Sequence, residues 1–182
     1  WQQGDGGVRA ILRAVKNASA LPSALCDQLL HLLPMVEDPA PLVSAIPHLV
    51  ADGGPEEVGR VVQEYRRLLN EDRAMLVHVV GSLHDLPIGK TTRREVSDMT
   101  LEALSMVDEE DLPVIVRTLL KNMGDADGAQ VVGRIREECS GCSPTTQAVL
   151  LEVLANAFPV NEAFTHAFLS SLATLVSSDF GE

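Results

Sequence analysis

The sequence is poor in aromatic residues. Aromatic side chains make up 3% of its 182 residues, although 46% of the residues are hydrophobic. A core therefore has to be built from Leu, Val and Ala, which favours closely packed helices over an aromatic-rich sandwich of strands. With this hydrophobic content and 22% charged residues, intrinsic disorder is excluded as the main state.

Cysteines and basic residues are also scarce. Three cysteines, an odd number, argue against a disulfide framework and for a reducing compartment. Only 14 Lys and Arg residues stand against 26 Asp and Glu residues, a net charge of −12. Such a chain repels phosphate, which makes a free-standing binder of duplex DNA an unfavourable interpretation.

Targeting signals and long apolar runs are missing from the sequence. No basic segment followed by an apolar run opens it, which predicts that it has no signal peptide. The uncharged run 163–178 is shorter than the roughly 20 apolar residues of a membrane span. We therefore expect a soluble intracellular chain without a membrane segment. Because the sequence starts at Trp1 and not at Met, we expect a fragment or a processed product.

What the sequence does contain is a helical hydrophobic period along most of its length. Three stripes with spacings of three and four residues each place apolar side chains on one helix face. They are Val58, Val61, Val62, Tyr65, Leu68 and Leu69; Leu112, Ile115, Val116, Leu119, Leu120 and Met123; and Leu150, Val153, Leu154, Ala157 and Phe158. Hydrophobic–Pro pairs and Gly-rich stretches separate such segments and mark most helix ends. The pattern predicts about ten helices, over 7–18, 23–36, 40–51, 56–69, 72–84, 92–106, 111–122, 127–138, 144–158 and 162–177.

Two short motifs recur. The segment 34–38 is repeated at 105–109, which places Met106 71 residues after Met35. The segment 58–62 is repeated at 132–136, and Val132 lies 74 residues after Val58. A repeat of two helix pairs is typical of an α-solenoid, in which one unit buries its apolar face only when a neighbour stacks on it. We predict an all-α fold of antiparallel helix pairs stacked as a HEAT- or armadillo-like α-solenoid, with 1–182 as a single helical-repeat domain.

The acidic run Asp108–Asp111 directly precedes an apolar stripe. It could hold a metal or a basic partner, but carboxylates at a helix start also cap free N–H groups and oppose the helix dipole. Pro113 suits a first helical turn. We interpret the run as a helix N-terminus.

Three further features contain residue types that occur in chemical sites. The pair Cys139 and Cys142 forms a single C-x-x-C motif, without the second ligand pair of a zinc site or the strand–loop–helix context of a redox dithiol. Gly89-Lys90-Thr91 resembles the end of a phosphate-binding loop but lacks its first glycine and a preceding strand, and therefore predicts a helix start. The basic groups Lys90, Arg93, Arg94 and Arg9, Arg13, Lys16 are interpreted as solvated helix faces. The sequence predicts no enzyme, no metal and no cofactor.

A family resemblance rests on several ordered segments. They are 110–116, 119–121 and 132–137, preceded by 29–34 and 45–50 and followed by 150–158. In this order they resemble the helical segment of the Fanconi anaemia group D-two family around its ubiquitin-acceptor helix, with Asp111, Leu112 and Pro113 as a structural signature. The resemblance covers most of residues 25–175.

The resemblance implies a function. It implies a fragment of a large nuclear α-solenoid protein of DNA interstrand-crosslink repair. Such a protein pairs with the I-like subunit of the Fanconi ID complex and closes around duplex DNA as part of that complex. It is regulated by monoubiquitination through the ubiquitin-conjugation machinery. The partner-interface candidates are Leu151, Ala155 and Phe158. A generic HEAT- or armadillo-like adaptor and a small metal or redox enzyme using Cys139 and Cys142 remain as alternatives.

One position departs from the family pattern. The resemblance aligns the family's acceptor lysine with Ala155, and the only lysines of the chain are Lys16, Lys90 and Lys121. No ε-amine is therefore present from residue 122 onward, and an isopeptide bond at this helix is chemically impossible. A divergent orthologue, an engineered substitution or a sister solenoid that never used the modification would each explain this. The helical period places Ala155 with Leu151 and Phe158 on a half-buried flank.

Overall fold

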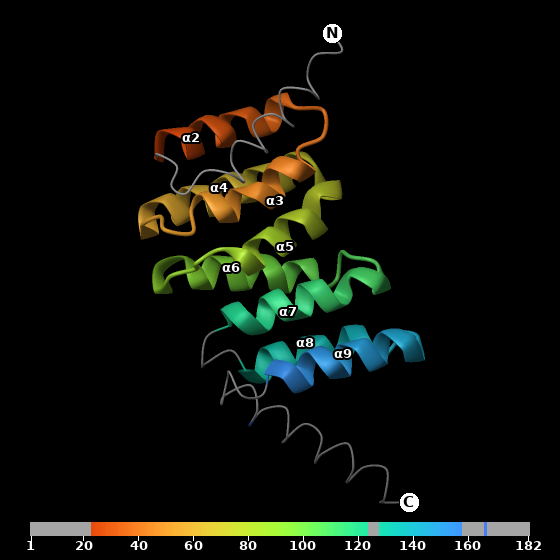
Figure 1. The fold of residues 1–182 in the computed structure, drawn as a ribbon. Coiled ribbons are helices and arrows are strands. Elements are labelled where there is room, and N and C mark those ends of the chain that lie inside the picture. Colours follow the sequence, from red (N-terminus) through yellow and green to blue (C-terminus); the bar gives the residue numbers. More distant parts are fainter. Residues whose placement is uncertain (1–22, 124–127, 158–165, 167–182) are drawn as a thin grey trace, which may run out of the picture. The chain divides into compact units, whose positions relative to one another are not determined.

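In a computed structural model, the described residues are 23–123, 128–157 and 166 (Figure 1). Within these ranges the chain forms eight α-helices and three short 3₁₀ helices, and no strand. The fold divides into two compact units between Thr92 and Arg93. The predicted all-α class is confirmed, whereas a single domain over 1–182 stays a prediction.

Four helices, two 3₁₀ segments and the start of a fifth helix make up the first unit. These are α2 (Ser23–Leu32), η1 (Leu33–Met35), α3 (Ala40–Leu49), α4 (Pro55–Glu71), η2 (Arg73–Met75), α5 (Leu76–Asp85) and the first residues of α6 (Lys90–Ala103). Helix α3 packs extensively against α5, and α4 contacts α5 and η2. The predicted stripe on α4 faces inward, since Val58, Val61, Val62, Tyr65 and Leu68 are buried.

The second unit contains the rest of α6, η3 (Glu109–Asp111), α7 (Leu112–Asn122), α8 (Gly128–Cys139) and α9 (Pro144–Ala157). Helix α7 packs along α9 (Figure 1). The predicted stripe on α7 is its buried face, with Leu112, Ile115, Val116, Leu119 and Leu120 in the core. The helices predicted over 7–18 and 162–177 lie outside the described residues.

One proline departs from the expected role of a helix boundary. Pro47 lies inside α3 and is buried. It has no N–H with which to bond the carbonyl of Val43 one turn earlier, a defect that normally costs a helix interior about 3 kcal/mol. Here the Tyr65 hydroxyl on α4 donates to that carbonyl at 2.9 Å, and the Ser82 hydroxyl on α5 donates to it at 2.8 Å. The two hydroxyl oxygens also lie 2.6 Å apart. Two neighbouring helices therefore supply the bond that Pro47 removes.

The two units share one internal order of helices. In the first, α3 packs on α5, and in the second α7 packs on α9. The repeated motifs occupy matching places. Met35 is exposed at the end of η1, and Met106 is exposed in the turn after α6. Val58 and Val132 are buried near the starts of α4 and α8. Stacked helix pairs of this kind confirm the predicted α-solenoid class.

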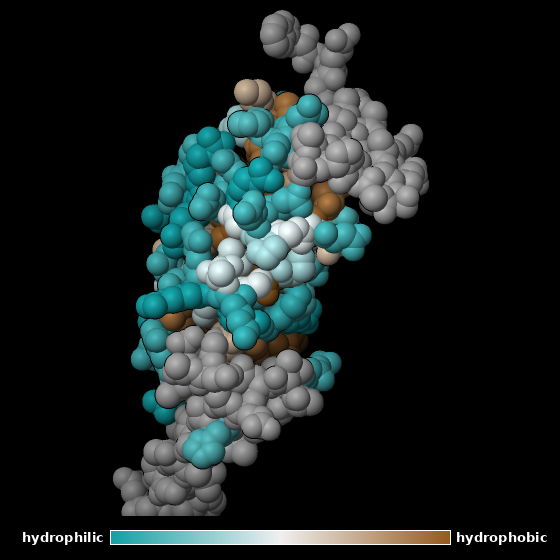
Figure 2. Space-filling view, turned by 90° about the vertical axis from the view of Figure 1, so that its left-hand side faces the viewer, coloured by the Kyte–Doolittle hydropathy of each residue, from teal (hydrophilic) through white to brown (hydrophobic). Residues whose placement is uncertain are grey.

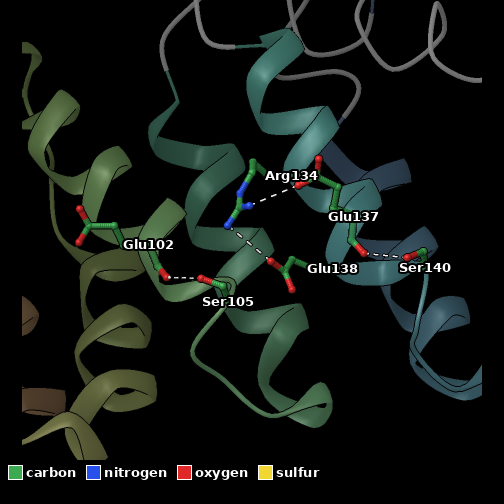
Figure 3. Close-up of polar contacts among 6 residues, drawn as sticks. All are labelled: Glu102, Ser105, Arg134, Glu137, Glu138 and Ser140. Atoms are coloured by element: carbon green, nitrogen blue, oxygen red, sulfur yellow. Dashed lines mark hydrogen bonds and ion pairs between the residues drawn. The ribbon is translucent and has the colours of Figure 1, made fainter.

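One arginine of the second unit pairs with two glutamates of its own helix. The Arg134 guanidinium on α8 lies 3.3 Å from a Glu137 carboxylate oxygen and 3.5 Å from one of Glu138 (Figure 3). In the first unit the matching residue, Arg60, instead bridges from α4 to Asp27 on α2 at 3.1 Å. Exposed pairs of this kind contribute at most about 1 kcal/mol, so packing of the apolar stripes stabilises the units.

Helix ends in the second unit are closed by serines. The Ser105 hydroxyl donates to the Glu102 carbonyl at 3.3 Å, and the Ser140 hydroxyl donates to the Glu137 carbonyl at 2.8 Å (Figure 3). These bonds occupy carbonyl groups that a helix terminus leaves without intrahelical partners.

Candidate protein-interaction surface on α9

Exposed apolar side chains are concentrated on α9. Hydrophilic residues prevail on the face of the molecule in Figure 2, and hydrophobic ones show there in separate areas. Four large hydrophobic side chains are exposed among the described residues, and two of them, Val149 and Leu151, lie on α9 at 42% and 59% exposure. The other two are Met35 and Met106. Helix α9 is therefore the described helix that presents two such side chains to solvent.

The inward face of α9 follows the predicted stripe. Leu150, Val153 and Leu154 are buried, and α9 packs on α7. Between these positions the helix exposes Ala148, Leu151 and Ala155, spaced three and four residues apart and therefore on one face. We call these three residues the α9 outer face. Ala155 is exposed, and not on a half-buried flank as its period suggested, while Phe158 lies outside the described residues.

Comparison with the first unit shows that the α9 outer face differs from its counterpart. The first repeated motif recurs after 71 residues, so we compare each residue of α9 with the residue 71 positions earlier in the sequence. The buried residues of α9 then correspond to buried residues of α5: Leu150 to Val79, Val153 to Ser82 and Leu154 to Leu83. The same shift matches Leu151 with Val80. Val80 has no exposed surface, whereas Leu151 is 59% exposed. Leu151 is thus exposed where its counterpart is buried, while Val77 and His84, the counterparts of Ala148 and Ala155, are half-buried.

The N-terminus of α9 is held by a carboxylate from η3. Both the backbone N–H of Ser143, at 2.8 Å, and its hydroxyl donate to one oxygen of Glu109. The Ser143 hydroxyl oxygen in turn accepts from the backbone N–H of Thr146 at 3.3 Å, in the manner of an N-cap. The hydrogen bond from the Ser143 hydroxyl, followed by those from Thr146 and the Ser143 backbone, lowers the pKa of Glu109 below its ordinary value. This contact joins the start of α7 to the start of α9.

The contact predicts a pH dependence. Because the folded-state pKa of Glu109 is lowered from 4.5, its contribution to stability is present above that pH and is lost as the pH falls below it. We expect Glu109→Gln to flatten the acid limb of a plot of melting temperature against pH. Glu110→Gln, one residue along in η3, is the control and should leave the acid limb unchanged. An acid limb that is the same in Glu109→Gln and the parental chain would contradict this role of Glu109.

The signature residues of the acidic run occupy a helix start, as expected. Glu109–Asp111 form η3, Asp111 is the N-cap residue of α7, and Pro113 lies in the first turn. Leu112 is buried. The signature residues Asp111, Leu112 and Pro113 therefore lie at the start of α7 and not on the α9 outer face.

The remaining chemical candidates do not come together. Burial, and then the negative charges of Glu109 and Glu138, raise the pKa of the Cys142 thiol, which disfavours the reactive thiolate; the side chain of Cys139 lies outside the described residues. Residues Gly89–Thr91 lead into α6, which begins at Lys90. In the described part of the chain no three His, Cys, Asp or Glu side chains are grouped so as to hold a metal ion. None of the helices described is long and apolar enough to cross a membrane.

The architecture defines an all-α helical-repeat protein with an open apolar helix face. Residues 15–154 match the protein family described as "Fanconi anaemia protein FancD2 nuclease". The match spans more than half of the chain, and the chain belongs to this family.

Two curated relatives agree with this assignment. The chain is 27% identical over 103 residues to the Fanconi anemia group D2 protein of Gallus gallus, which covers 56% of the chain and 7% of that protein. It is 26% identical over 96 residues to the Fanconi anemia group D2 protein homolog of Rattus norvegicus, which covers 53% of the chain and 6% of that protein. The chain therefore spans less than a tenth of the length of either relative.

Proposed function

We propose that this chain is a scaffold segment of a Fanconi anaemia D2-like nuclear protein, which pairs with the I-like subunit and, within that complex, encloses duplex DNA during interstrand-crosslink repair. Membership of the family supports the role in DNA repair. The observation that carries the pairing is the α9 outer face, where Leu151 is exposed although its counterpart Val80 is buried. Apolar side chains that are buried on association supply most of the binding energy of an interface.

The pairing predicts a loss of binding in two charge variants. Leu151→Asp would put a carboxylate into the proposed contact, and we expect the affinity for the I-like subunit to fall at least tenfold, as it should for Ala155→Glu. Val149→Asp is the matched control. It makes a similar change on the same helix, at a position whose counterpart in α5, His78, is itself exposed. Affinity measured by calorimetry with the purified I-like subunit tests this, and equal affinities for Leu151→Asp and Val149→Asp would contradict the placement of the interface.

We propose further that the segment performs no catalysis, although the description of its family contains the word nuclease. Burial raises the pKa of Cys26 to about 11 and also raises that of Tyr65, so both groups are held neutral within the core. The lowered pKa of Glu109 comes from its bonds at a helix start. Cleavage of duplex DNA by the purified chain in the presence of Mg²⁺ would contradict this proposal.

Regulation by monoubiquitin at α9 requires an amine that the chain does not have there. The resemblance places Ala155 at the acceptor position; Ala155 is exposed, so a lysine at 155 would present its amine to solvent. We expect Ala155→Lys, but neither the parental chain nor Ala155→Arg, to be conjugated on α9 by the ubiquitin-conjugation machinery of the family. Peptide mass spectrometry of the product checks this. An unmodified Ala155→Lys would show that the alignment of this position is wrong or that the machinery needs more of the protein.

A generic helical-repeat adaptor remains the second candidate, because helix stripes alone are shared by many such proteins. It predicts that the α9 outer face binds a protein other than the I-like subunit. The affinity measurement above separates the two candidates.

A further inference from the structure

One serine–proline pair lies where the connector between α8 and α9 meets the second helix. Helix α8 ends at Cys139, and α9 begins at Pro144. Of the ten prolines in the sequence, Pro144 alone follows a hydroxyl-bearing residue, Ser143, whereas the others follow Leu, Ile, Phe, Asp, Ala or Gly. Proline has no N–H group, and proline-directed protein kinases select it directly after the serine or threonine that they phosphorylate. The sequence therefore contains one acceptor for a kinase of this class.

The acceptor serine is accessible. Ser143 is exposed, and none of the residues 143–149 is buried. The residue before a proline is biased toward an extended backbone, which is also the form in which kinases bind their substrates. Opening the first turn of α9 uncovers no buried side chain, because the buried positions of the helix begin at Leu150. Local opening of a helix end without core contacts costs little free energy, so a kinase can reach the hydroxyl group.

The same hydroxyl group holds the start of α9 to η3. The Ser143 O–H and the backbone N–H of that residue donate to one carboxylate oxygen of Glu109, and the N–H does so at 2.8 Å. Burial, and then the negative charges of Glu109 and Glu138, raise the pKa of the neighbouring Cys142 thiol. Two carboxylates therefore act on this connector. A further negative group on Ser143 would lie directly beside one of them.

We propose that Ser143 is a phosphorylation site for a proline-directed serine/threonine kinase, and that the phosphate separates the start of α9 from Glu109. The kinase transfers the γ-phosphoryl group of ATP. A bond forms between phosphorus and the Ser143 Oγ atom, the bond from phosphorus to the bridging oxygen of ADP breaks, and the hydroxyl proton passes to the catalytic base of the kinase. The proposal involves other residues than the α9 outer face, and it does not depend on the partner proposed above.

The phosphate reverses the sign of the contact. Phosphoserine has no hydroxyl proton to donate to Glu109, and it carries a charge of about −1.5 to −2 at pH 7. Repulsion between the phosphate and the carboxylate then replaces a hydrogen bond that stabilises the fold. The effect is confined to the first turn, because the buried residues Leu150, Val153 and Leu154 lie beyond it and keep α9 packed in the unit.

Phosphorylation of the chain by a purified proline-directed kinase with Mg²⁺ and ATP, mapped by peptide mass spectrometry, tests the site. We expect phosphate on Ser143 and not on Thr145 or Thr146, neither of which precedes a proline. Pro144→Ala keeps the serine and its bonds to Glu109, but it should lower the initial rate by roughly tenfold or more, because the selected residue is lost. An unmodified Ser143, or a rate that Pro144→Ala leaves unchanged, would overturn the proposal.

Melting temperatures with and without the phosphate test its effect on the contact. Phosphorylation should lower the melting temperature of the parental chain by roughly 2–4 °C, a shift typical of one lost contact in a chain of this size. In Glu109→Gln an amide that can donate to the phosphate replaces the carboxylate, so phosphorylation should leave the melting temperature unchanged or raise it. Glu110→Gln, one residue along in η3, is the matched control and should retain the loss. Equal shifts in the parental chain and Glu109→Gln, or a rise in both, would overturn the separation of α9 from Glu109.

Discussion

Removing both hydroxyl groups that bond Val43 is expected to lower the free energy of unfolding by about 2–4 kcal/mol. The Tyr65→Phe, Ser82→Ala double variant leaves the buried carbonyl without the bonds that α4 and α5 supply. A typical hydrogen bond contributes about 1 kcal/mol net, and an orphaned buried acceptor costs about 1–3 kcal/mol. Each single variant retains one donor to the carbonyl and should lose less than half of the total. Urea denaturation followed by circular dichroism measures the loss.

The cause of the loss can be separated from general damage to the core by restoring the helical bond. Pro47→Ala returns an N–H to the position from which a regular helix bonds the Val43 carbonyl. We expect Pro47→Ala to stabilise the double variant by about 1 kcal/mol or more beyond its effect on the parental chain, because only the double variant has an unsatisfied acceptor. Equal effects of Pro47→Ala in the two backgrounds would show that the hydroxyl groups do not compensate for the proline.

A cavity in the second unit is expected to have an effect of similar size. Leu119 on α7 has no exposed surface, and α7 is the helix on which α9 packs. Leu119→Ala should cost about 2–5 kcal/mol, the sum of the lost transfer free energy and the cavity that remains. Arg117→Ala, on the exposed side of the same helix, is the control and should change stability by less than about 0.5 kcal/mol.

Leu119→Ala also tests whether α7 and α9 depend on each other for their packing. We expect hydrogen exchange in Leu119→Ala to accelerate in α7 and α9 together, since each covers the other. Acceleration confined to α7 would mean that α9 is held chiefly by other contacts, such as the bond from Glu109 to Ser143 at its start. A melting curve unchanged by Leu119→Ala would contradict a close-packed α7.

The sequence predicted most of the elements correctly because each helix has its own apolar stripe. On α4 and α7 the stripes of Val, Leu and Ile became the buried faces, and the acidic run before Leu112 became a helix start. The segments 23–36 and 72–84 were expected to be single helices, but each contains a 3₁₀ turn, at η1 and η2. Helix period does not distinguish a regular helix from a tightened turn at its end, since both keep the same side roughly inward.

The candidate site was only partly accessible from the sequence. Leu151 and Ala155 were placed together on one face of a helix, and the structure has them there, but the period suggested partial burial for Ala155, which is exposed. The period of a helix fixes which residues share a face. It does not fix whether another helix covers that face, which depends on residues far away in the chain.

By itself the sequence determined the helical class and the internal repeat, because these depend on spacings of three, four and about seventy residues along one chain, and the order of its segments resembles the family to which it belongs. Only the tertiary structure decided that a proline can lie inside α3, because the hydroxyl groups that replace its missing bond come from residues 22 and 39 positions beyond Val43. The tertiary structure likewise decided that Leu151 on α9 is exposed although its counterpart Val80 on α5 is buried, since burial is a property of neighbouring elements and not of the stripe itself.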